Sequence, residues 1–141
     1  MHDLLRFHKA QSAGIYEIAL QELEQGQKCS HWMWFIFPQL RSLGRSNTAK
    51  LYGIADRAEA IAYLKDPILG TRLRTCCWAM LKHKGTPPDA VLGTIDAMKL
   101  RSCATLFDVV LPNDVFAEIL QVFYDAERCH DTLDEVGESS A

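Results

Sequence analysis

The chain has 141 residues, of which 48% are hydrophobic and 23% are charged, and its formal net charge is −3. These values are typical of one globular domain and exclude a disordered chain. The negative charge disfavours general binding to nucleic acid or to an anionic membrane. The longest apolar run, residues 32–38, is far shorter than the roughly 20 residues of a membrane helix, so no membrane segment is expected.

Five cysteines occur, at positions 29, 76, 77, 103 and 129. The number is odd and no Cys-x-x-Cys pair is present, so the sequence does not suggest a disulfide framework. The N-terminal residues carry charge and lack a long apolar core, which disfavours a signal peptide. We therefore predict reduced thiols and a cytoplasmic location.

Helix signals recur through the first half of the chain. Asp3 can cap a short opening helix, and Ser12 can cap a second helix that Gly26 ends. Asp56 and Glu59 resemble a capping box at the start of a segment rich in strong helix formers, AEAIAYLK. These signals predict three helices before residue 66.

The second half shows the same pattern more strongly. Asp66 and Pro67 precede a stripe of apolar residues at helical spacing, which Gly85 stops. Asp96 is expected to begin the next amphipathic helix. A turn at residues 112–114 then leads into a last helix, which Asp114 caps and which reaches Phe123.

Alternation typical of β-strands is scarce. The best strand candidate, MWFIF at residues 33–37, is short and equally compatible with a buried helix. We therefore predict an all-α fold, a single compact domain of about six or seven helices, several of them short, over residues 1–133. Residues 134–141 are predicted to form a disordered acidic tail.

An unusual motif occupies residues 28–39, which read KCSHWMWFIFPQ. Together with LGRS at 43–46, LGTRL at 69–73 and KLRSCATLF at 99–107, it resembles an uncharacterised family of small bacterial and fungal proteins, some of which carry the name calpastatin. The resemblance spans residue 7 to about residue 133. It implies a mainly α-helical protein and implies no activity, cofactor or oligomeric state. Inhibition of calcium-dependent proteases is disfavoured, because such inhibitors are expected to be long and disordered.

The polar residues in and around this motif suit a small ligand. Lys28 can bind an anionic group, Trp34 can stack on a flat ring, and Gln39 offers a donor and an acceptor. The hypothesis is a pocket for a nucleotide-like or phosphorylated compound, with possible enzymatic activity, in which the imidazole of His31 is the candidate general acid or base. The predicted ligand-binding residues are Lys28, His31, Trp34, Gln39, Ser46, Tyr52 and Lys99.

Several residues in and around the motif also have a plain structural interpretation, although core packing does not require Lys28 or Gln39. Large aromatic residues usually belong to the core, Ser30 can cap a helix, and His31 can bond a neighbouring backbone group. A second polar group on the helix after Asp96 either completes the pocket or faces solvent; it comprises Lys99, Arg101, Ser102 and Thr105.

Two further interpretations of the sequence concern a metal site and a protein-interaction surface. Cys29, His31, Cys129 and His130 lack the spacing of zinc ligands, so no metal site is predicted. The alternative function is a protein-interaction module, in which Trp32 or Trp34 forms an exposed hot spot. Burial separates the alternatives, since a pocket requires concave empty volume and an interaction surface requires exposed rings.

Overall fold

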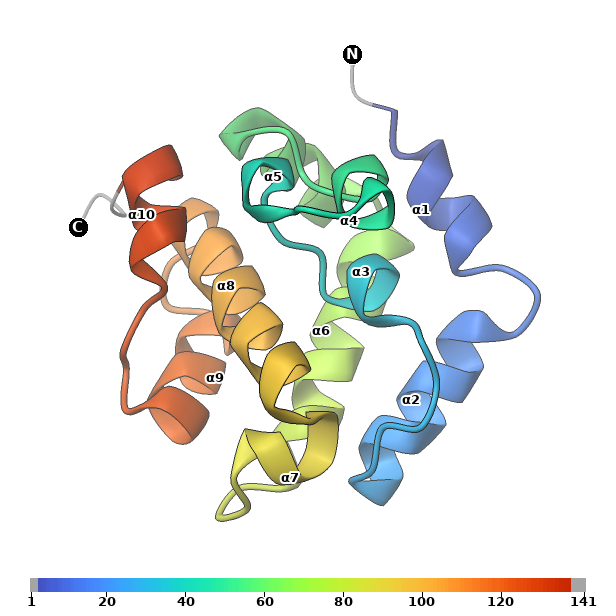
Figure 1. Cartoon of the computed structure of the whole chain (residues 1–141), viewed down its shortest axis with the longest axis vertical. Helices are drawn as coiled ribbons and strands as arrows, with labels where there is room; N and C mark the ends of the chain where they lie inside the picture. The colour runs from blue at the N-terminus through green and yellow to red at the C-terminus, as the bar shows by residue number, and fades with distance from the viewer. Residues whose placement is uncertain (1–2, 138–141) are drawn as a thin grey trace.

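The computed structural model describes residues 3–137, which form ten α-helices and one 3₁₀ turn. No β-strand occurs among the described residues, and the nearest feature is an isolated parallel bridge between Leu40 and Ile54. The all-α prediction is confirmed. Figure 1 shows the helices, which are α1 (Leu5–Ala10), α2 (Ile15–Gln25), α3 (Met33–Ile36), α4 (Asn47–Leu51), α5 (Arg57–Lys65), α6 (Leu69–Leu81), α7 (Pro88–Leu92), α8 (Thr94–Val110), α9 (Val115–Tyr124) and α10 (His130–Val136), with the 3₁₀ turn η1 at Arg41–Leu43.

Six of the described helices have seven or more residues, and the other four are shorter. The total exceeds the six or seven predicted, because α3, α4 and α7 are too short to show a full hydrophobic period. Helix α10 was also not predicted, and it includes residues 134–136, the first part of the predicted tail. Residues 138–141 lie outside the described residues, so the disordered tail stays a prediction.

Several predicted helix boundaries are confirmed by hydrogen bonds. Asp56 accepts from the backbone N–H of Glu59 at 2.9 Å, and Asp114 accepts from the N–H of Val115 at 2.7 Å. Gly26 ends α2 in the left-handed conformation, with φ of 80°.

Two predicted boundaries are wrong. Ser12 does not cap α2, because its hydroxyl donates to the carbonyl of Lys9 and the helix begins after Gly14. Asp96 lies in the first turn of α8 instead of before it, because Gly93, at φ of 86°, allows the helix to begin at Thr94. Because α8 begins two residues earlier than predicted, Asp96 lies within its first turn, where its carboxylate is available to other side chains.

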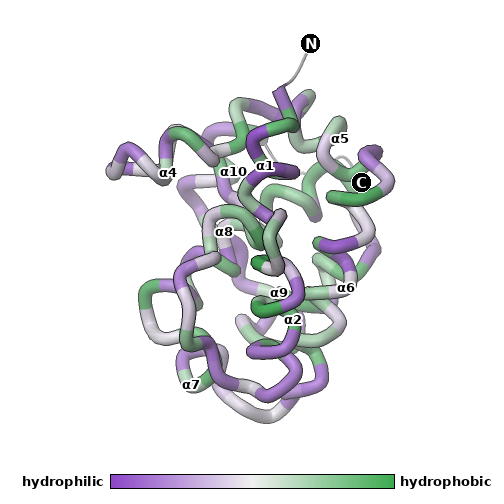
Figure 2. The backbone as a smooth tube through the Cα atoms, turned by 90° about the vertical axis from the view of Figure 1, so that its right-hand side faces the viewer, coloured by the Kyte–Doolittle hydropathy of each residue, from purple (hydrophilic) through white to green (hydrophobic). Residues whose placement is uncertain are grey.

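Helix α8 is the central element of the domain (Figure 1). It packs against α5, α7, α9 and α10, while α6 packs against α2, α5 and α9. Figure 2 shows hydrophobic stretches concentrated along α6, α8 and α9. The short helix α3 contacts α6 and so holds the aromatic motif against the core.

A chain of aromatic rings runs through the core and joins four helices. Phe7 meets Tyr63 edge-on with ring centroids 5.1 Å apart, and Tyr63 lies 5.6 Å from Phe107. Phe107 in turn lies 5.5 Å from Phe116. These separations are in the range at which aromatic pairs stabilise a core beyond simple burial. Helices α1, α5, α8 and α9 are thus fixed relative to one another.

None of the helices within residues 3–137 combines the length and the apolar character that crossing a membrane requires.

The junction of α5 and α6 depends on a close approach at Gly70. A Cβ atom added there would lie 2.3 Å from the carbonyl oxygen of Leu64, which is backbone and cannot move aside alone. We expect Gly70→Ala to lower the free energy of unfolding by about 2 kcal/mol, although alanine is otherwise the better helix former. Urea unfolding measures the change. Thr71→Ala, at an exposed position of the same helix, is the control and should change stability little; equal stabilities of the two variants would contradict the close approach.

Candidate functional site

The loop between α2 and α3 is organised by the carboxylate of Glu22. Its Oε1 accepts from the backbone N–H groups of Cys29 and Ser30 at 2.8 and 3.0 Å and from the indole N–H of Trp32 at 2.9 Å. Its Oε2 accepts from the hydroxyl of Ser30 at 2.6 Å. Four donors on one carboxylate fix the path of the chain through residues 29–32. The N–H of Lys28 just before them donates to the carbonyl of Val91 at 2.8 Å, so the loop is also tied to α7.

These hydrogen bonds change the acidity of Glu22. Burial by itself would raise the pKa of the carboxyl, but the hydrogen bonds from Ser30, Cys29 and Trp32 outweigh it and lower the pKa to about 2. The carboxylate is therefore charged across the whole physiological pH range. The loop that carries the aromatic motif is held by a permanent negative charge.

Lys28 and Lys99 share one acidic partner. The ammonium of Lys28 lies 2.8 Å from Oδ2 of Asp96, and the ammonium of Lys99 lies 3.2 Å from Oδ1. The side chain of Lys28 is only 9% exposed, which is unusual for lysine. Two positive charges thus face one negative charge, and this cluster keeps an excess of one positive charge.

The two ammonium groups also lie over aromatic rings. The Lys99 nitrogen is 4.1 Å from the ring centroid of Trp34, and the Lys28 nitrogen is 5.0 Å from that of Trp32. Both distances permit cation–π attraction. The indole N–H of Trp34 is buried and has no hydrogen-bond partner among residues 3–137, so one donor of the motif remains unused.

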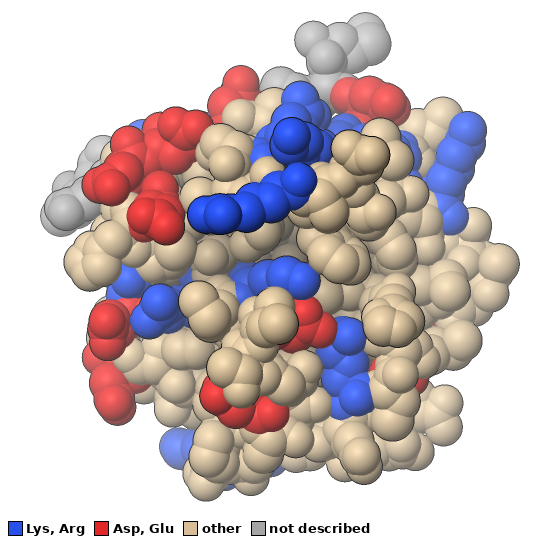
Figure 3. Space-filling model, in the orientation of Figure 1, with Lys and Arg blue, Asp and Glu red and all other residues tan. Residues whose placement is uncertain are grey.

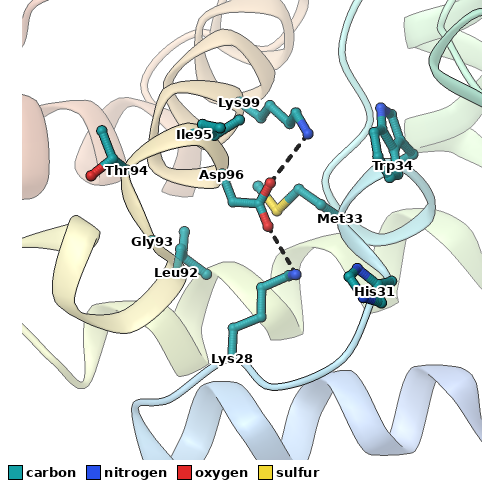
Figure 4. A pocket seen from close by; sticks show the side chains of 10 residues that line it. All are labelled: Lys28, His31, Met33, Trp34, Leu92, Gly93, Thr94, Ile95, Asp96 and Lys99. Carbon is teal, nitrogen blue, oxygen red and sulfur yellow. Dashed lines mark hydrogen bonds and ion pairs between the residues drawn. The ribbon is translucent and has the colours of Figure 1, made fainter. Parts of the chain in front are cut away.

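These groups line an open cavity of about 500 Å³, which we call the lysine cavity. Figure 4 shows both lysines reaching Asp96 from opposite sides, with His31 and Trp34 facing them. The imidazole of His31 is exposed at this wall. The first residues of α8 form another wall, so the positive end of a 17-residue helix adds to the local field. The residues that define the lysine cavity are Lys28, His31, Trp34, Asp96 and Lys99.

A second open cavity of about 600 Å³, which we call the arginine cavity, adjoins the first. Ile95 and Lys99 line both. Its other charged lining residues are Arg45, Arg101 and Asp131, so three cations with Lys99 face one acid. Its polar lining residues are Gln39, Ser42, Ser102 and Cys129. Figure 3 shows Lys and Arg side chains gathered across the upper and middle part of this face, although the chain as a whole is negative.

Cys129 lines the arginine cavity, and its thiol accepts a hydrogen bond there. The hydroxyl of Ser102 donates to its sulfur at 3.2 Å, and its backbone N–H donates to Thr105 at 3.0 Å. Burial of the thiol opposes ionisation, but hydrogen bonding from Ser102 and the nearby charge of Arg101 lower the pKa of Cys129 below its usual value. In contrast, burial raises the pKa values of Cys76, Cys77 and Cys103.

Five of the seven predicted ligand-binding residues line the two cavities. Lys28, His31, Trp34 and Lys99 line the lysine cavity, while Gln39 and again Lys99 line the arginine cavity. In the second polar group, Arg101 and Ser102 reach the arginine cavity, but Thr105 is fully buried and its hydroxyl donates to the carbonyl of Arg101.

Ser46 and Tyr52 lie outside both cavities. Ser46 caps α4 by accepting from the N–H of Ala49 at 3.1 Å. Tyr52 packs edge-on against Phe35 with ring centroids 4.8 Å apart and lies near Phe7. Both residues were predicted because they are near the aromatic motif in sequence. In the fold, the chain after η1 leads away from the two cavities, so neither residue lines them.

Glu22, Asp96 and Cys129 are among the site residues that were not predicted as such. Asp96 was interpreted as a helix start, and single acids such as Glu22 occur in most helices. The sequence does contain a signal for the pairing of Asp96 with Lys99. The two residues are three positions apart, so on a helix they lie on the same face.

The described residues contain no group of three or more His, Cys, Asp and Glu side chains that could hold a metal ion.

Comparisons with known proteins agree on the family. A family model described as "Protein of unknown function (DUF1810)" matches residues 1–136. The chain belongs to this family. A crystal structure of the conserved hypothetical protein Rv1873 from Mycobacterium tuberculosis is similar to it, with 40% identical residues, 94% of each chain covered and a TM-score of 0.90. No curated protein matches the chain. The family resemblance is thus confirmed at the level of an uncharacterised family.

The low pKa of Glu22 predicts a pH dependence of stability. Because the folded pKa of about 2 lies below the ordinary value of 4.5, the stabilisation is complete above about pH 5 and is lost as the pH falls towards 2. Glu22→Gln should be less stable than the wild type by on the order of 2–3 kcal/mol at pH 7, and the difference should shrink on acidification. Urea unfolding at several pH values measures it. Glu24→Gln, on the same helix but exposed, is the control; a difference independent of pH would contradict the assignment.

The setting of Cys129 predicts its reactivity. Iodoacetamide should alkylate it with a pH midpoint below that of a free cysteine, about 8.5, while Cys76, Cys77 and Cys103 stay unmodified in the folded protein. Peptide mass spectrometry after timed alkylation identifies each site. Ser102→Ala removes the hydrogen bond and should raise the midpoint; a midpoint at or above the free-cysteine value in the wild type would count against a lowered pKa.

Proposed function

We propose that this protein binds a small nucleotide-like or phosphorylated compound in the lysine cavity. The observation that carries the proposal is the side chain of Lys28, which is nine-tenths buried at an open cavity of about 500 Å³. Burying a lysine costs free energy even when it is paired. Asp96 balances only one of the two lysines that contact it, so an anionic ligand would supply the missing negative charge.

The remaining lining residues fit the other parts of such a compound. The indole of Trp34 offers a flat ring, which suits a base or a similar heterocycle. The backbone N–H groups at the start of α8 suit a phosphate group. The cavity volume lies within the range of small-molecule sites. A phosphate near the lysines and a ring near Trp34 is the arrangement that uses most of these groups.

His31 is the candidate general acid or base of this site. It is the imidazole among the lining residues of the lysine cavity, and its side chain is open to solvent. An imidazole ordinarily titrates near neutral pH and can therefore transfer a proton under physiological conditions. Proton transfer to or from a bound compound is the chemistry that this position would supply.

The alternative function, a protein-interaction module built on the tryptophans of the motif, has weaker support. Trp32 is only 1% exposed, so its ring belongs to the core. Trp34 is partly buried against Lys99. Near the motif, an interaction surface would use the exposed apolar side chains of Ile95 and Met98 on α8 instead.

Calorimetric titration with AMP tests the proposal. We expect AMP to bind more tightly than either adenosine or inorganic phosphate, because each of these fills only part of the cavity. Lys28→Gln, Lys99→Gln and His31→Ala should each weaken AMP binding, the two lysine variants by at least about tenfold. Circular dichroism verifies that the variants are folded.

Lys82→Gln removes an exposed lysine that does not line the cavity, and it should bind AMP like the wild type. Unchanged AMP affinity in both Lys28→Gln and Lys99→Gln, or no binding at millimolar AMP, would overturn the proposal.

A further inference from the structure

The arginine cavity contains polar groups that the fold leaves without partners. Among residues 3–137, the guanidinium of Arg45, the amide of Gln39 and the hydroxyl of Ser42 make no side-chain hydrogen bond or ion pair, although all three line this cavity. The Nε of Arg101 is buried and likewise has no hydrogen-bond partner. Buried donors without partners are rare in folded proteins, so this one calls for an acceptor.

The neighbouring acids offset these cations only in part. Glu127 forms a long ion pair with Arg101 at 3.8 Å, beyond hydrogen-bond distance, and its side chain is largely exposed. Asp131 is the acid on the wall of the cavity, against Arg45, Lys99 and Arg101. The net lining charge is therefore positive by two. A guanidinium pair is well suited to bind a carboxylate or a phosphate through two parallel hydrogen bonds.

We propose that the arginine cavity is an anion-binding subsite, in which Arg45 and Arg101 hold a second anionic group, a carboxylate or a phosphate, of the same ligand. Ile95 and Lys99 line both cavities, so the two volumes are adjacent and one molecule can occupy both. This proposal rests on the proposed function only for the idea that a single ligand spans them. The ligand class becomes a compound with a ring and two separated anionic groups.

The thiol of Cys129 provides a reporter inside this cavity. Iodoacetate and iodoacetamide both react with its thiolate, which displaces iodide and forms a carbon–sulfur bond. The two reagents differ in charge, one being a carboxylate and the other a neutral amide. Because the same thiolate reacts in both cases, the ratio of the two rates does not depend on the pKa of Cys129. The ratio measures the attraction of the cavity for an anion.

The experiment uses the full chain with Cys29→Ser, which removes the exposed cysteine outside the cavity. We expect the iodoacetate-to-iodoacetamide rate ratio at Cys129 to exceed that of N-acetylcysteine by about fivefold at low salt. Inorganic phosphate or malonate should lower the ratio more than sodium chloride of equal ionic strength does. Stronger competition by phosphate or by malonate identifies which anionic group the cavity prefers.

Arg45→Gln and Arg101→Gln should each bring the ratio towards that of N-acetylcysteine. Arg45 is exposed, so its variant is expected to fold even if the more buried Arg101 proves important for stability. Arg41→Gln is the matched control, since it removes the same charge from the same loop outside the cavity, and it should keep the high ratio. A wild-type ratio equal to that of N-acetylcysteine, or a ratio unchanged in both variants, overturns the proposal.

The two proposals fail in distinguishable ways. Lys28 lines only the lysine cavity, so Lys28→Gln should reduce AMP binding and leave the rate ratio at Cys129 unchanged. A raised rate ratio at Cys129 without AMP binding supports the anion subsite and overturns the nucleotide site. AMP binding with a rate ratio equal to that of N-acetylcysteine supports the nucleotide site and overturns the anion subsite.

Discussion

The arrangement of the site depends on one carboxylate, that of Glu22, and on the donors that surround it. Without this anchor, residues 29–32 would form a loop with no regular hydrogen bonds of their own. With it, the indole of Trp32 is fixed in the core and the backbone enters α3 at a defined position. Lys28 is placed as a consequence, because it is held between this anchored loop and the carbonyl of Val91. A single charged side chain thereby sets the position of a buried ammonium group.

Positive charge is concentrated at the two cavities although the chain as a whole is negative. The chain carries a net charge of −3, yet the lysine and arginine cavities together collect four cations, Lys28, Arg45, Lys99 and Arg101, against two acids. Lysine and arginine usually extend into water, where their charges are screened. Here the side chains of Lys28 and Lys99 are largely buried beside tryptophan rings, so solvent screens their charges less than at an open surface. The amino-acid composition alone does not reveal such a local concentration of positive charge.

The long helices could be predicted from sequence because burial imposes a period on them, as in the stripe from Leu69 to Leu81. The short helices α3, α4 and α7 could not, since tertiary packing and not periodicity stabilises them. Lys28 and Gln39 could be singled out from sequence as polar residues among aromatic rings, and both line a cavity. The sequence could not show that Ser46 and Tyr52 lie outside both cavities or that Cys129 lines one of them, because only the folded chain shows which distant segments meet.

The position of Lys99 between the two cavities has a thermodynamic consequence. Its ammonium group already divides its interactions between Asp96 and the ring of Trp34, and it borders both volumes. An anion on one side that draws this group towards itself changes the field felt on the other side. Linkage requires that any such effect be mutual, so occupancy of either cavity alters affinity at its neighbour by the same factor. If both cavities bind anions, one side chain would couple them without any movement of the helices.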